Sequence, residues 1–468
     1  MASAPQTESE STTSPYLSGN FAPVIDEVTQ FDLPVIGELP AELTGRYLRN
    51  GPNPLGEVDP ATHHWFIGDG MVHGIRLDGG RAAWYRNRYV GSSRLSDARG
   101  EPEIPGPNWN GNPYGPNTNV GAWAGTTWAM VEAGGCPVEL GYELDTIGRN
   151  DFGGTITGAF SAHPKYDPVT RELHAMVYAL PEWMDHVAYI VIGADGKARK
   201  ELEIPLAGMP MVHDMSLTRT WALLYDQPVT IDIELAASSI FPFRWNPDHG
   251  RRVGLVPREG TPDEIVWIDL PLGYAFHPLN AYDTEDGRVI VDICTYDRIF
   301  DRDRFGPLGD GAFGRLERWE LDPVTRTASI SVMDERPTDF PRGNDAVATR
   351  EHRYGWFLSG SADETDTWST VKQDLSTGRR WEFDHGPARQ AGEAVFVARD
   401  DARSEDDGWL LTYVNDHNTG GADFVVMDAL DFERDDYVAR VPLPQRVPFG
   451  FHGNWVSDRT VPPGGSGG

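Results

Sequence analysis

Short runs of alternating apolar and polar residues, separated by turn sequences, extend along most of this chain, from about Asp32 to Ser457. Residues 82–90, 288–293 and 409–414 are examples, and they are rich in Val, Ile, Leu, Tyr and Trp. A repeat of two residues with this composition is typical of β-strands. Two turns, at residues 166–171 and 321–326, are near copies that share the sequence Asp-Pro-Val-Thr-Arg. Turns of this kind carry the chain from one strand into the next.

Helical patterns are scarce, since only residues 40–43 and 233–237 have the composition of short helices. The pattern therefore predicts an all-β fold. Many four-stranded units joined by hairpins favour a β-propeller, in which the units form a ring around a central axis. The repeats are irregular and lack a Trp-Asp or kelch signature, so a pair of β-sandwiches is the alternative.

The strand pattern continues through the 468 residues without a change in composition. We therefore expect one catalytic domain over residues 16–458, a disordered segment at 1–15 and a flexible Gly/Ser tail at 459–468. No apolar run reaches the roughly eighteen residues of a membrane span, and the first residues do not resemble a secretory signal. Only two cysteines, Cys136 and Cys294, occur, which excludes a disulfide framework and favours a cytoplasmic protein.

The formal net charge is −31, with carboxylates spread along the whole chain. Nucleic-acid binding needs clustered Lys and Arg, so this charge argues against a nucleic-acid partner and against docking on anionic lipid. An aromatic loop at residues 240–247 leaves another route to a membrane open. If the loop lies outside, Phe241, Phe243 and Trp245 form a substrate mouth or a patch for transient contact at the membrane periphery. If it folds back, they form a small satellite core.

Four of the thirteen histidines stand in short apolar or aromatic segments, each beside a residue that ends or bends a strand. They are His163 before Pro164, His213 before Asp214, His277 before Pro278 and His452 before Gly453. No local metal motif has their spacing, but a propeller can bring distant strand ends to one axis. Neutral imidazole is a strong ligand for Fe, Zn, Cu and Ni. The other nine are expected to be ordinary surface or core residues: His63, His64, His73, His174, His186, His249, His352, His385 and His417.

Three carboxylates are candidates for holding such histidines. A histidine that binds a metal usually donates its second ring N–H to a carboxylate or a carbonyl. Glu132 and Glu393 lie in apolar segments, and Asp339 lies just before Phe340 and Pro341. A buried carboxylate is costly unless it accepts hydrogen bonds, which is what this role would provide. The alternative is an ordinary solvent-facing carboxylate, and it is strongest for Asp339.

The chain resembles the carotenoid cleavage oxygenase family over nearly its whole length. The matching segments are residues 16–24, 45–54, 68–73 and 451–455, together with the four histidine segments in the same order. The resemblance implies a seven-bladed β-propeller with a cap of loops and short helices over the metal axis. It also implies Fe²⁺ bound by His163, His213, His277 and His452, which are held in turn by Glu132, Asp339 and Glu393. The family usually has Glu where Asp339 stands, so this shorter side chain would need a water molecule or a shifted backbone to reach its histidine.

The resemblance further implies a dioxygenase whose partners are O2 and an apolar alkene. Both oxygen atoms would enter the two carbonyl products, and open coordination positions make such a metal site catalytic. In the family a residue near Thr118 approaches one of these positions; an ordinary strand or turn threonine is the alternative. Stilbene-cleaving relatives carry Lys where Val131 stands. We therefore expect a carotenoid or apocarotenoid substrate, with a stilbene or phenylpropene as the alternative.

Two other classes of function agree less well with the sequence. A propeller that only binds a partner would have lost part of the metal site, whereas all four histidines are present. A zinc hydrolase usually has three protein ligands and a general base, and a site of four histidines fits it poorly.

Overall fold

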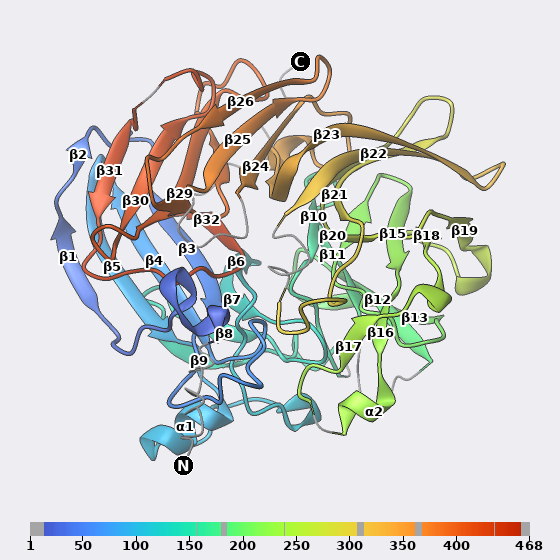
Figure 1. The fold of residues 1–468 in the computed structure, drawn as a ribbon, viewed down its shortest axis with the longest axis horizontal. Coiled ribbons are helices and arrows are strands. Elements are labelled where there is room, and N and C mark those ends of the chain that lie inside the picture. The colour runs from blue at the N-terminus through green and yellow to red at the C-terminus, as the bar shows by residue number, and fades with distance from the viewer. Residues whose placement is uncertain are drawn as a thin grey trace, which may run out of the picture.

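The computed structural model describes residues 14–156, 158–178, 185–237, 239–306, 313–360, 367–434 and 436–459. The segments predicted to be disordered or flexible, 1–15 and 459–468, lie outside these residues, apart from Ser14, Pro15 and Arg459. The regular secondary structure of the described chain is mainly β-sheet, as predicted, with two short α-helices, α1 (Ser93–Arg99) and α2 (Ile233–Ala236) (Figure 1). Single turns of 3-10 helix cover Pro15–Leu17, Gly19–Phe21, Trp109–Gly111, Pro247–His249, Pro262–Glu264 and Asp345–Val347.

One sheet joins the two ends of the chain. Its strands are, in order, β1 (Thr29–Leu33), β5 (Arg81–Tyr89), β4 (Gly70–Asp78), β3 (Gly45–Pro52) and β32 (Gly453–Ser457). A second sheet contains β2 (Ile36–Gly37), β31 (Ala439–Pro442), β30 (Gly421–Asp428), β29 (Gly408–Asp416), β27 (Arg389–Ala391) and β28 (Val395–Ala398). The last strand therefore pairs with β3, while the early strand β2 pairs with β31. Both exchanges tie the N-terminal part of the fold to the C-terminal part.

Three four-stranded antiparallel sheets follow the first one along the chain. Their strands are β6 (Asn119–Trp123), β7 (Thr126–Met130), β8 (Val138–Leu140) and β9 (Thr146–Arg149); β10 (Lys165–Asp167), β11 (Glu172–Val177), β12 (His186–Ile192) and β13 (Ala198–Pro205); and β14 (Met215–Leu217), β15 (Trp221–Asp226), β18 (Arg252–Pro257) and β19 (Val266–Asp269). A hairpin of β16 (Val229–Ile231) and β17 (Phe243–Trp245) stands in the long connection between β15 and β18.

The largest sheet has seven strands and consists of two four-stranded units that share one strand. Its order is β20 (Tyr274–Asp283), β21 (Val289–Tyr296), β22 (Gly314–Asp322), β23 (Thr327–Arg342), β24 (Tyr354–Ser359), β25 (Ser369–Asp374) and β26 (Arg379–Phe383). The shared strand β23 is 16 residues long. Its earlier part pairs with β22, whereas Asp339 and Arg342 pair with β24, with register shifts in both ladders. These irregularities let one strand serve both units.

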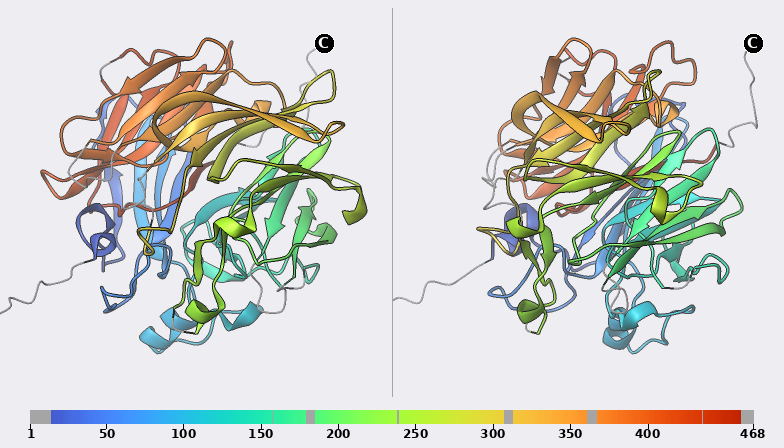
Figure 2. Two further views of the ribbon diagram at one scale, coloured as in Figure 1. Left: turned by 45° about the vertical axis from the view of Figure 1, so that its right-hand side comes forward. Right: turned by 90° about the vertical axis from the view of Figure 1, so that its right-hand side faces the viewer.

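The sheets follow one another in chain order around the middle of the molecule, from blue through green and gold to red (Figures 1 and 2). Neighbouring sheets pack through buried apolar side chains; Tyr47 and Tyr85 of the first sheet, for example, join Leu411 and Phe424 of the last. Both α-helices lie with long loops on one side, at the bottom of each view. Among the described residues, no helix is long and apolar enough to cross a membrane.

Aspartates fix the predicted turns. Asp167 Oδ1 accepts the N–H groups of Val169 (2.8 Å) and Thr170 (3.3 Å), and Asp322 makes the equivalent pair of hydrogen bonds. Both turns close with an arginine at positive φ, and the related turn after Asp374 has Gly378 (φ 73°) near its end, where a left-handed backbone costs less. The helix predicted at residues 40–43 is wrong: this segment is a turn, closed by a 3.1 Å hydrogen bond from Leu43 N–H to the carbonyl of Pro40.

The aromatic loop at residues 240–247 folds back onto the molecule. Phe241, Phe243 and Trp245 are only 8%, 6% and 9% exposed and belong to a core cluster that also contains Met211 and Phe276. Pairing of β17 with β16 satisfies the loop's backbone and presses the rings inward. The predicted membrane contact through these three side chains is therefore wrong, because the side chains are buried.

Candidate metal centre

The structure brings His163, His213, His277 and His452 together. His163, His213 and His452 lie just before the edge strands β10, β14 and β32, and His277 lies within the edge strand β20. All four are buried, and each offers a ring nitrogen within 4.8 Å of the others. Among the described residues, none of the other nine histidines joins such a group. Strand ends that are far apart in sequence thus meet at one point.

The sequence explains the bend at His277. Pro278 follows it and has no N–H to donate to a neighbouring strand. The register of β20 against β21 shifts on both sides of Pro278, between Ala275 and Asn280. This bulge turns the imidazole out of the regular alternation of the strand and toward the other three rings.

Three of the rings are held by the three carboxylates named from the sequence. Nδ1 lies 2.9 Å from a carboxylate oxygen in each pair: His213 with Glu132, His277 with Asp339, and His452 with Glu393. An ionised carboxylate can only accept, so each Nδ1 carries the proton and each Nε2 carries the lone pair. The carboxylates therefore set both the orientation and the tautomer of these rings.

The lone pairs consequently point at one another. The Nε2 atoms of His213 and His277 lie 3.2 Å apart, and Nε2 of His163 is buried without a hydrogen-bond partner. Two lone pairs at this distance repel each other unless a cation or a proton lies between them. This arrangement fits a transition-metal ion held by neutral imidazoles.

Asp339 reaches its histidine directly, although it is one methylene shorter than Glu. Phe340, the next residue, has a left-handed backbone (φ 52°), and the register of β23 shifts here. Oδ1 accepts from His277 and from the Phe340 N–H (2.7 Å), and Oδ2 accepts from the Tyr296 hydroxyl. The shifted backbone, rather than a bridging water molecule, compensates for the shorter side chain. The alternative of a solvent-facing Asp339 is excluded, because this residue is only 2% exposed.

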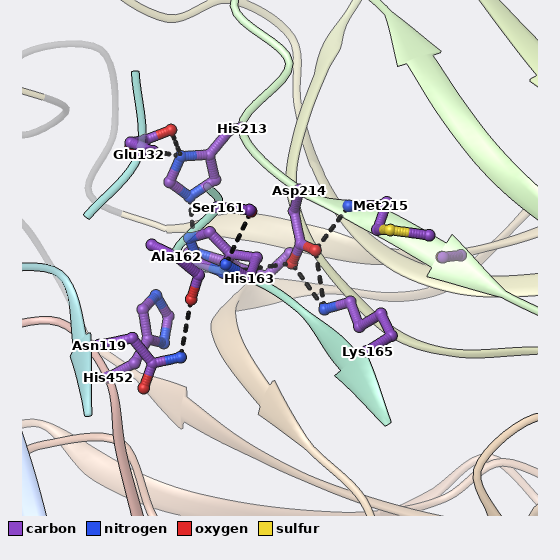
Figure 3. A network of polar contacts seen from close by, with 12 residues as sticks. Asn119, Glu132, Ser161, Ala162, His163, Lys165, His213, Asp214, Met215 and His452 are labelled. Carbon is purple, nitrogen blue, oxygen red and sulfur yellow. Dashed lines mark hydrogen bonds and ion pairs between the residues drawn. The ribbon is translucent and has the colours of Figure 1, made fainter. Parts of the chain in front are cut away.

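His163 is held differently from the other three (Figure 3). Its nearest carboxylate is Asp214, with Oδ2 3.5 Å from His163 Nδ1. Asp214 is already committed to Lys165 at 2.7 Å and to the Met215 N–H at 2.6 Å. The backbone of His163 is fixed by its own hydrogen bond to the Ser161 hydroxyl (3.0 Å). Sequence reasoning missed the pair of Lys165 and Asp214, although each stands within two residues of a predicted ligand.

Burial favours the neutral form of two of the four histidines, His163 and His452. Burial, reinforced by the neighbouring histidines, lowers the pKa of His163 well below its usual value, and burial lowers that of His452 to about 4 despite the attraction of Glu393. Burial also acts against charge on His277, but Asp339 outweighs it and raises this pKa. The site therefore favours one positive charge beside Asp339, which a bound metal ion would supply.

Glu393 is held by an arginine as well as by hydrogen bonds. Burial alone would raise its pKa, but Arg342, His452 and the Gly453 N–H together lower it to about 2. Gly453 N–H lies 2.9 Å from Oε2, and Arg342 lies 3.4 Å from the same atom. Glu393 is therefore ionised at neutral pH.

An apolar cavity opens on one side of the four histidines. It encloses about 1030 Å³ of space, its open mouth included, which is at the upper end of pockets that bury small molecules. Aromatic side chains dominate its wall, among them Trp65, Phe66, Phe241, Phe276 and Phe451; His213, His277 and His452 form part of it. An apolar ligand in this cavity would lie against the metal centre.

Thr118 and Val131 both line the apolar cavity. The Thr118 carbonyl accepts the His452 N–H (3.0 Å), and its hydroxyl donates to Asn117 Oδ1 (3.0 Å). Its only hydroxyl proton is therefore already engaged. Val131 presents no charge next to Glu132, as expected from the sequence.

A polar channel opens on the other side of the same histidines. His163, His277 and His452 line it together with Lys165, Asp214, Arg342 and Glu393. His277 and His452 thus belong to both spaces, while His213 faces only the apolar cavity and His163 only the channel. The centre separates an apolar space from a polar one.

Comparison with known proteins identifies the family. The sequence model of the retinal pigment epithelial membrane protein family matches residues 21–457. A carotenoid cleavage oxygenase of Mycobacterium tuberculosis is 42% identical, over 94% of this chain and 97% of the relative. The chain belongs to the carotenoid cleavage oxygenase family. The membership predicted from sequence is confirmed, and with it an alkene-cleaving dioxygenase as the class of enzyme.

Other members of this family are similar in sequence and in structure. A carotenoid 9,10(9',10')-cleavage dioxygenase of Crocus sativus is 32% identical, over 95% of this chain and 90% of the relative. The crystal structure of Pseudomonas brassicacearum lignostilbene dioxygenase superposes with a TM-score of 0.84 at 28% identity, covering 98% and 100% of the two chains. Cobalt-substituted Synechocystis apocarotenoid oxygenase gives 0.80 at 25% identity, covering 93% and 97%. The all-β architecture is thus that of the family.

Two functional residues escaped the sequence reasoning. Tyr178 donates its hydroxyl to Glu132 Oε2 (2.5 Å), and Tyr296 donates to Asp339. Both tyrosines are buried and line the apolar cavity. Burial, followed by the neighbouring carboxylate, raises the pKa of each phenol well above its usual value, so both stay protonated as donors. No local pattern distinguishes them from other strand tyrosines.

Proposed function

We propose that this chain is a non-haem Fe²⁺ dioxygenase that cleaves a C=C bond of a carotenoid or apocarotenoid into two carbonyl products. The observation that carries the proposal is the convergence of four histidines at the wall of an apolar cavity. The reaction balances as one alkene and one O2 giving two carbonyl groups, so it needs no external reductant.

His163, His213, His277 and His452 are the proposed ligands of Fe²⁺. When bound there, Fe²⁺ supplies the redox chemistry that lets O2 react with an alkene. Glu132, Asp339 and Glu393 orient three of the rings, as their 2.9 Å hydrogen bonds support. The aromatic wall holds the alkene against the centre and excludes water from it. Thr118 would limit what fits beside His452 without offering a proton of its own.

The character of the cavity supports a polyene as substrate. Its lining is mainly aromatic and aliphatic, and Val131 offers neither charge nor hydrogen bond to a phenol. The relatives from Mycobacterium tuberculosis and Crocus sativus are both named for carotenoid cleavage. A stilbene or phenylpropene is the second candidate, because the lignostilbene dioxygenase superposes over the whole chain.

We further propose that the sheets close into a seven-bladed propeller. The four-stranded units can be counted as seven when the seven-stranded sheet is divided at β23 and the β16–β17 hairpin is set aside. The exchange of β32 and β2 between the first and last sheets supports closure of the ring. Loops, α1 and α2 on the side of the apolar cavity would form the cap.

The cytoplasm is the proposed location. Cys136 and Cys294 are both buried and unpaired, as expected in a reducing compartment.

Metal analysis and turnover of anaerobically purified protein test this proposal. We expect about one Fe²⁺ per chain and O2-dependent cleavage of an apocarotenal into two carbonyl products. ¹⁸O2 should label both products. Cleavage of a 4-hydroxystilbene alone would favour the second candidate. If iron-loaded protein cleaves neither the apocarotenal nor the hydroxystilbene, the proposed function is wrong. The variant His277→Ala should bind no iron.

A further inference from the structure

Tyr178 and Tyr296 occupy equivalent places at two of the four histidines. Each ring forms part of the wall of the apolar cavity, and each hydroxyl donates to the carboxylate that orients a histidine. Two series of hydrogen bonds result. One runs from Tyr178 through Glu132 to His213, and the other from Tyr296 through Asp339 to His277. A ligand in the cavity would touch the tyrosine at one end of each series, and the metal would lie at the histidine at the other end.

The carboxylates beside the remaining two histidines, His163 and His452, are held by groups that line the polar channel or by backbone N–H groups, and not by a tyrosine of the cavity wall. Glu393 is held by Arg342 and the Gly453 N–H, and both Glu393 and Arg342 line the polar channel. His163 is placed beside Asp214, whose partner Lys165 also faces the channel. The cavity therefore contacts the supports of His213 and His277, and the channel contacts those of His163 and His452.

Aromatic contacts extend the connection into the cavity wall. The Phe276 ring packs edge-on against Tyr296 at 5.6 Å between centroids and against His213 at 5.0 Å. Tyr178 makes an edge contact with Phe243 at 6.1 Å. When a ligand fills the cavity, the side chains of the wall have no empty space to move into, so contacts between them transmit a displacement.

We infer that Tyr178 and Tyr296 are positioning residues through which occupancy of the apolar cavity is sensed at His213 and His277. This inference rests on the proposed function. Each hydroxyl fixes the rotation of its carboxylate and takes up part of its negative charge. Without the hydroxyl, each carboxylate loses one of its hydrogen-bond donors and turns more freely about the histidine N–H. An alkene pressed against the ring would shift the hydroxyl, and the shift would reach the imidazole.

The first test measures metal release and requires no turnover. Release of Fe²⁺ to an excess of a coloured chelator should be about tenfold faster in Tyr178→Phe and in Tyr296→Phe, the usual effect of losing a partner of this kind. Tyr189→Phe is the matched control: its buried hydroxyl lies 2.7 Å from Nδ1 of His174, which is not one of the four histidines of the centre, and release should stay within about twofold of the wild type. A release rate unchanged in both variants would overturn the inference.

A double-mutant cycle separates positioning from a general loss of structure. Tyr178→Phe should have no further effect on Fe²⁺ release in a Glu132→Ala background, because the carboxylate through which Tyr178 acts is then absent. Additive effects of the two substitutions would show that Tyr178 acts by another route.

The second test measures the sensing itself. Co²⁺-loaded protein is studied by low-temperature electron paramagnetic resonance, without O2, before and after addition of an apocarotenal. We expect the apocarotenal to shift the Co²⁺ signal in the wild type and in Tyr189→Phe, and the shift to disappear in the double variant Tyr178→Phe/Tyr296→Phe. A shift that persists in the double variant would refute sensing through the tyrosines. Failure of the wild type to take up Co²⁺ or Fe²⁺ would instead refute the proposed function.

Discussion

The substitution Asp339→Asn tests whether the carboxylate charge, and not only its shape, holds a metal ion at His277. Asn has the same size as Asp, so it creates neither a cavity nor overpacking. The amide oxygen can keep the hydrogen bonds from His277 Nδ1 and from the Phe340 N–H, which both reach Oδ1 now. The amide NH2 would then face Tyr296, whose hydroxyl can turn to accept from it. The variant should fold with only a small decrease in thermal stability.

The expected loss of affinity follows from these contacts. A hydrogen bond to a charged group contributes about 1.5–3 kcal/mol, and a neutral one about 0.5–1.5 kcal/mol, so the bond from His277 weakens by about 1–1.5 kcal/mol. That difference alone corresponds to about a tenfold change in affinity. The variant also removes the negative charge that raises the pKa of His277 and so favours a cation beside it. We therefore expect Fe²⁺ to bind about 10- to 100-fold more weakly.

Competition with a chelator of known affinity measures this change under anaerobic conditions. Asp226→Asn is the control, since Asp226 is also buried and accepts from a histidine, His249, at 2.6 Å. It should lower the stability of the fold without changing the dissociation constant for Fe²⁺. A dissociation constant for Asp339→Asn within about twofold of the wild-type value would refute the argument from charge.

Three further predictions concern the cavity, the core and the centre. Val131→Lys should raise the KM for an apocarotenal, because it brings an unpaired ammonium group into an apolar cavity; an unchanged KM would mean that the substrate avoids this part of the wall. Burial, followed by the charge of Arg389, lowers the pKa of His385 to about 3. As the pH falls, the unfolded state therefore takes up this proton first, and the free energy of unfolding decreases between about pH 6.5 and 3. Below pH 6, His385→Gln should reduce the slope of unfolding free energy against pH by about 1.4 kcal/mol per unit in urea titrations, whereas an unchanged slope would contradict a buried neutral imidazole. Fe²⁺ present at 100 times its dissociation constant should raise the free energy of unfolding by about 2.7 kcal/mol, and a chelator should remove this gain. Denaturant unfolding with and without chelator measures the difference; equal stability would mean that no metal binds the folded state.

Much of the fold could be predicted because strands and turns have local causes. Alternation of apolar residues marks a strand wherever one face is buried, and an aspartate that accepts two backbone N–H groups marks a turn, as at Asp167 and Asp322. The false helix at residues 40–43 shows the limit of composition. Ala41, Glu42 and Leu43 have good helix propensity but lie in a turn, since β3 begins at Gly45 and leaves no room for a helix.

The prediction that the aromatic loop contacts a membrane was wrong for a different reason. Whether Phe241, Phe243 and Trp245 are exposed depends on the pairing of β17 with β16, and the two strands are separated by α2. A three-residue strand between Pro242 and Pro247 is too short to show a readable alternation. Tertiary packing decided the position of these rings, and no local pattern records it.

The histidines and carboxylates of the centre could be named because their segments are unusual, but their pairing could not. Glu132 lies closer in sequence to His163 than to His213, yet it holds His213 at 2.9 Å. The partner of each histidine is determined by which sheets lie next to each other around the axis. Tyr178 and Tyr296 were missed for the same reason, since only the folded chain brings their hydroxyls to carboxylates that are distant in sequence.

The carboxylates determine what the four histidines can bind. Four imidazoles brought together could equally form hydrogen bonds in pairs, with Nε2–H of one ring donating to Nε2 of the next. Here the proton of three rings is fixed on Nδ1 by Glu132, Asp339 and Glu393, so the nitrogens that face inward can only accept. The 3.2 Å approach of His213 Nε2 to His277 Nε2 is then unfavourable without a cation. A relative that kept all four histidines but lost these carboxylates would keep the geometry and lose much of its preference for a metal ion.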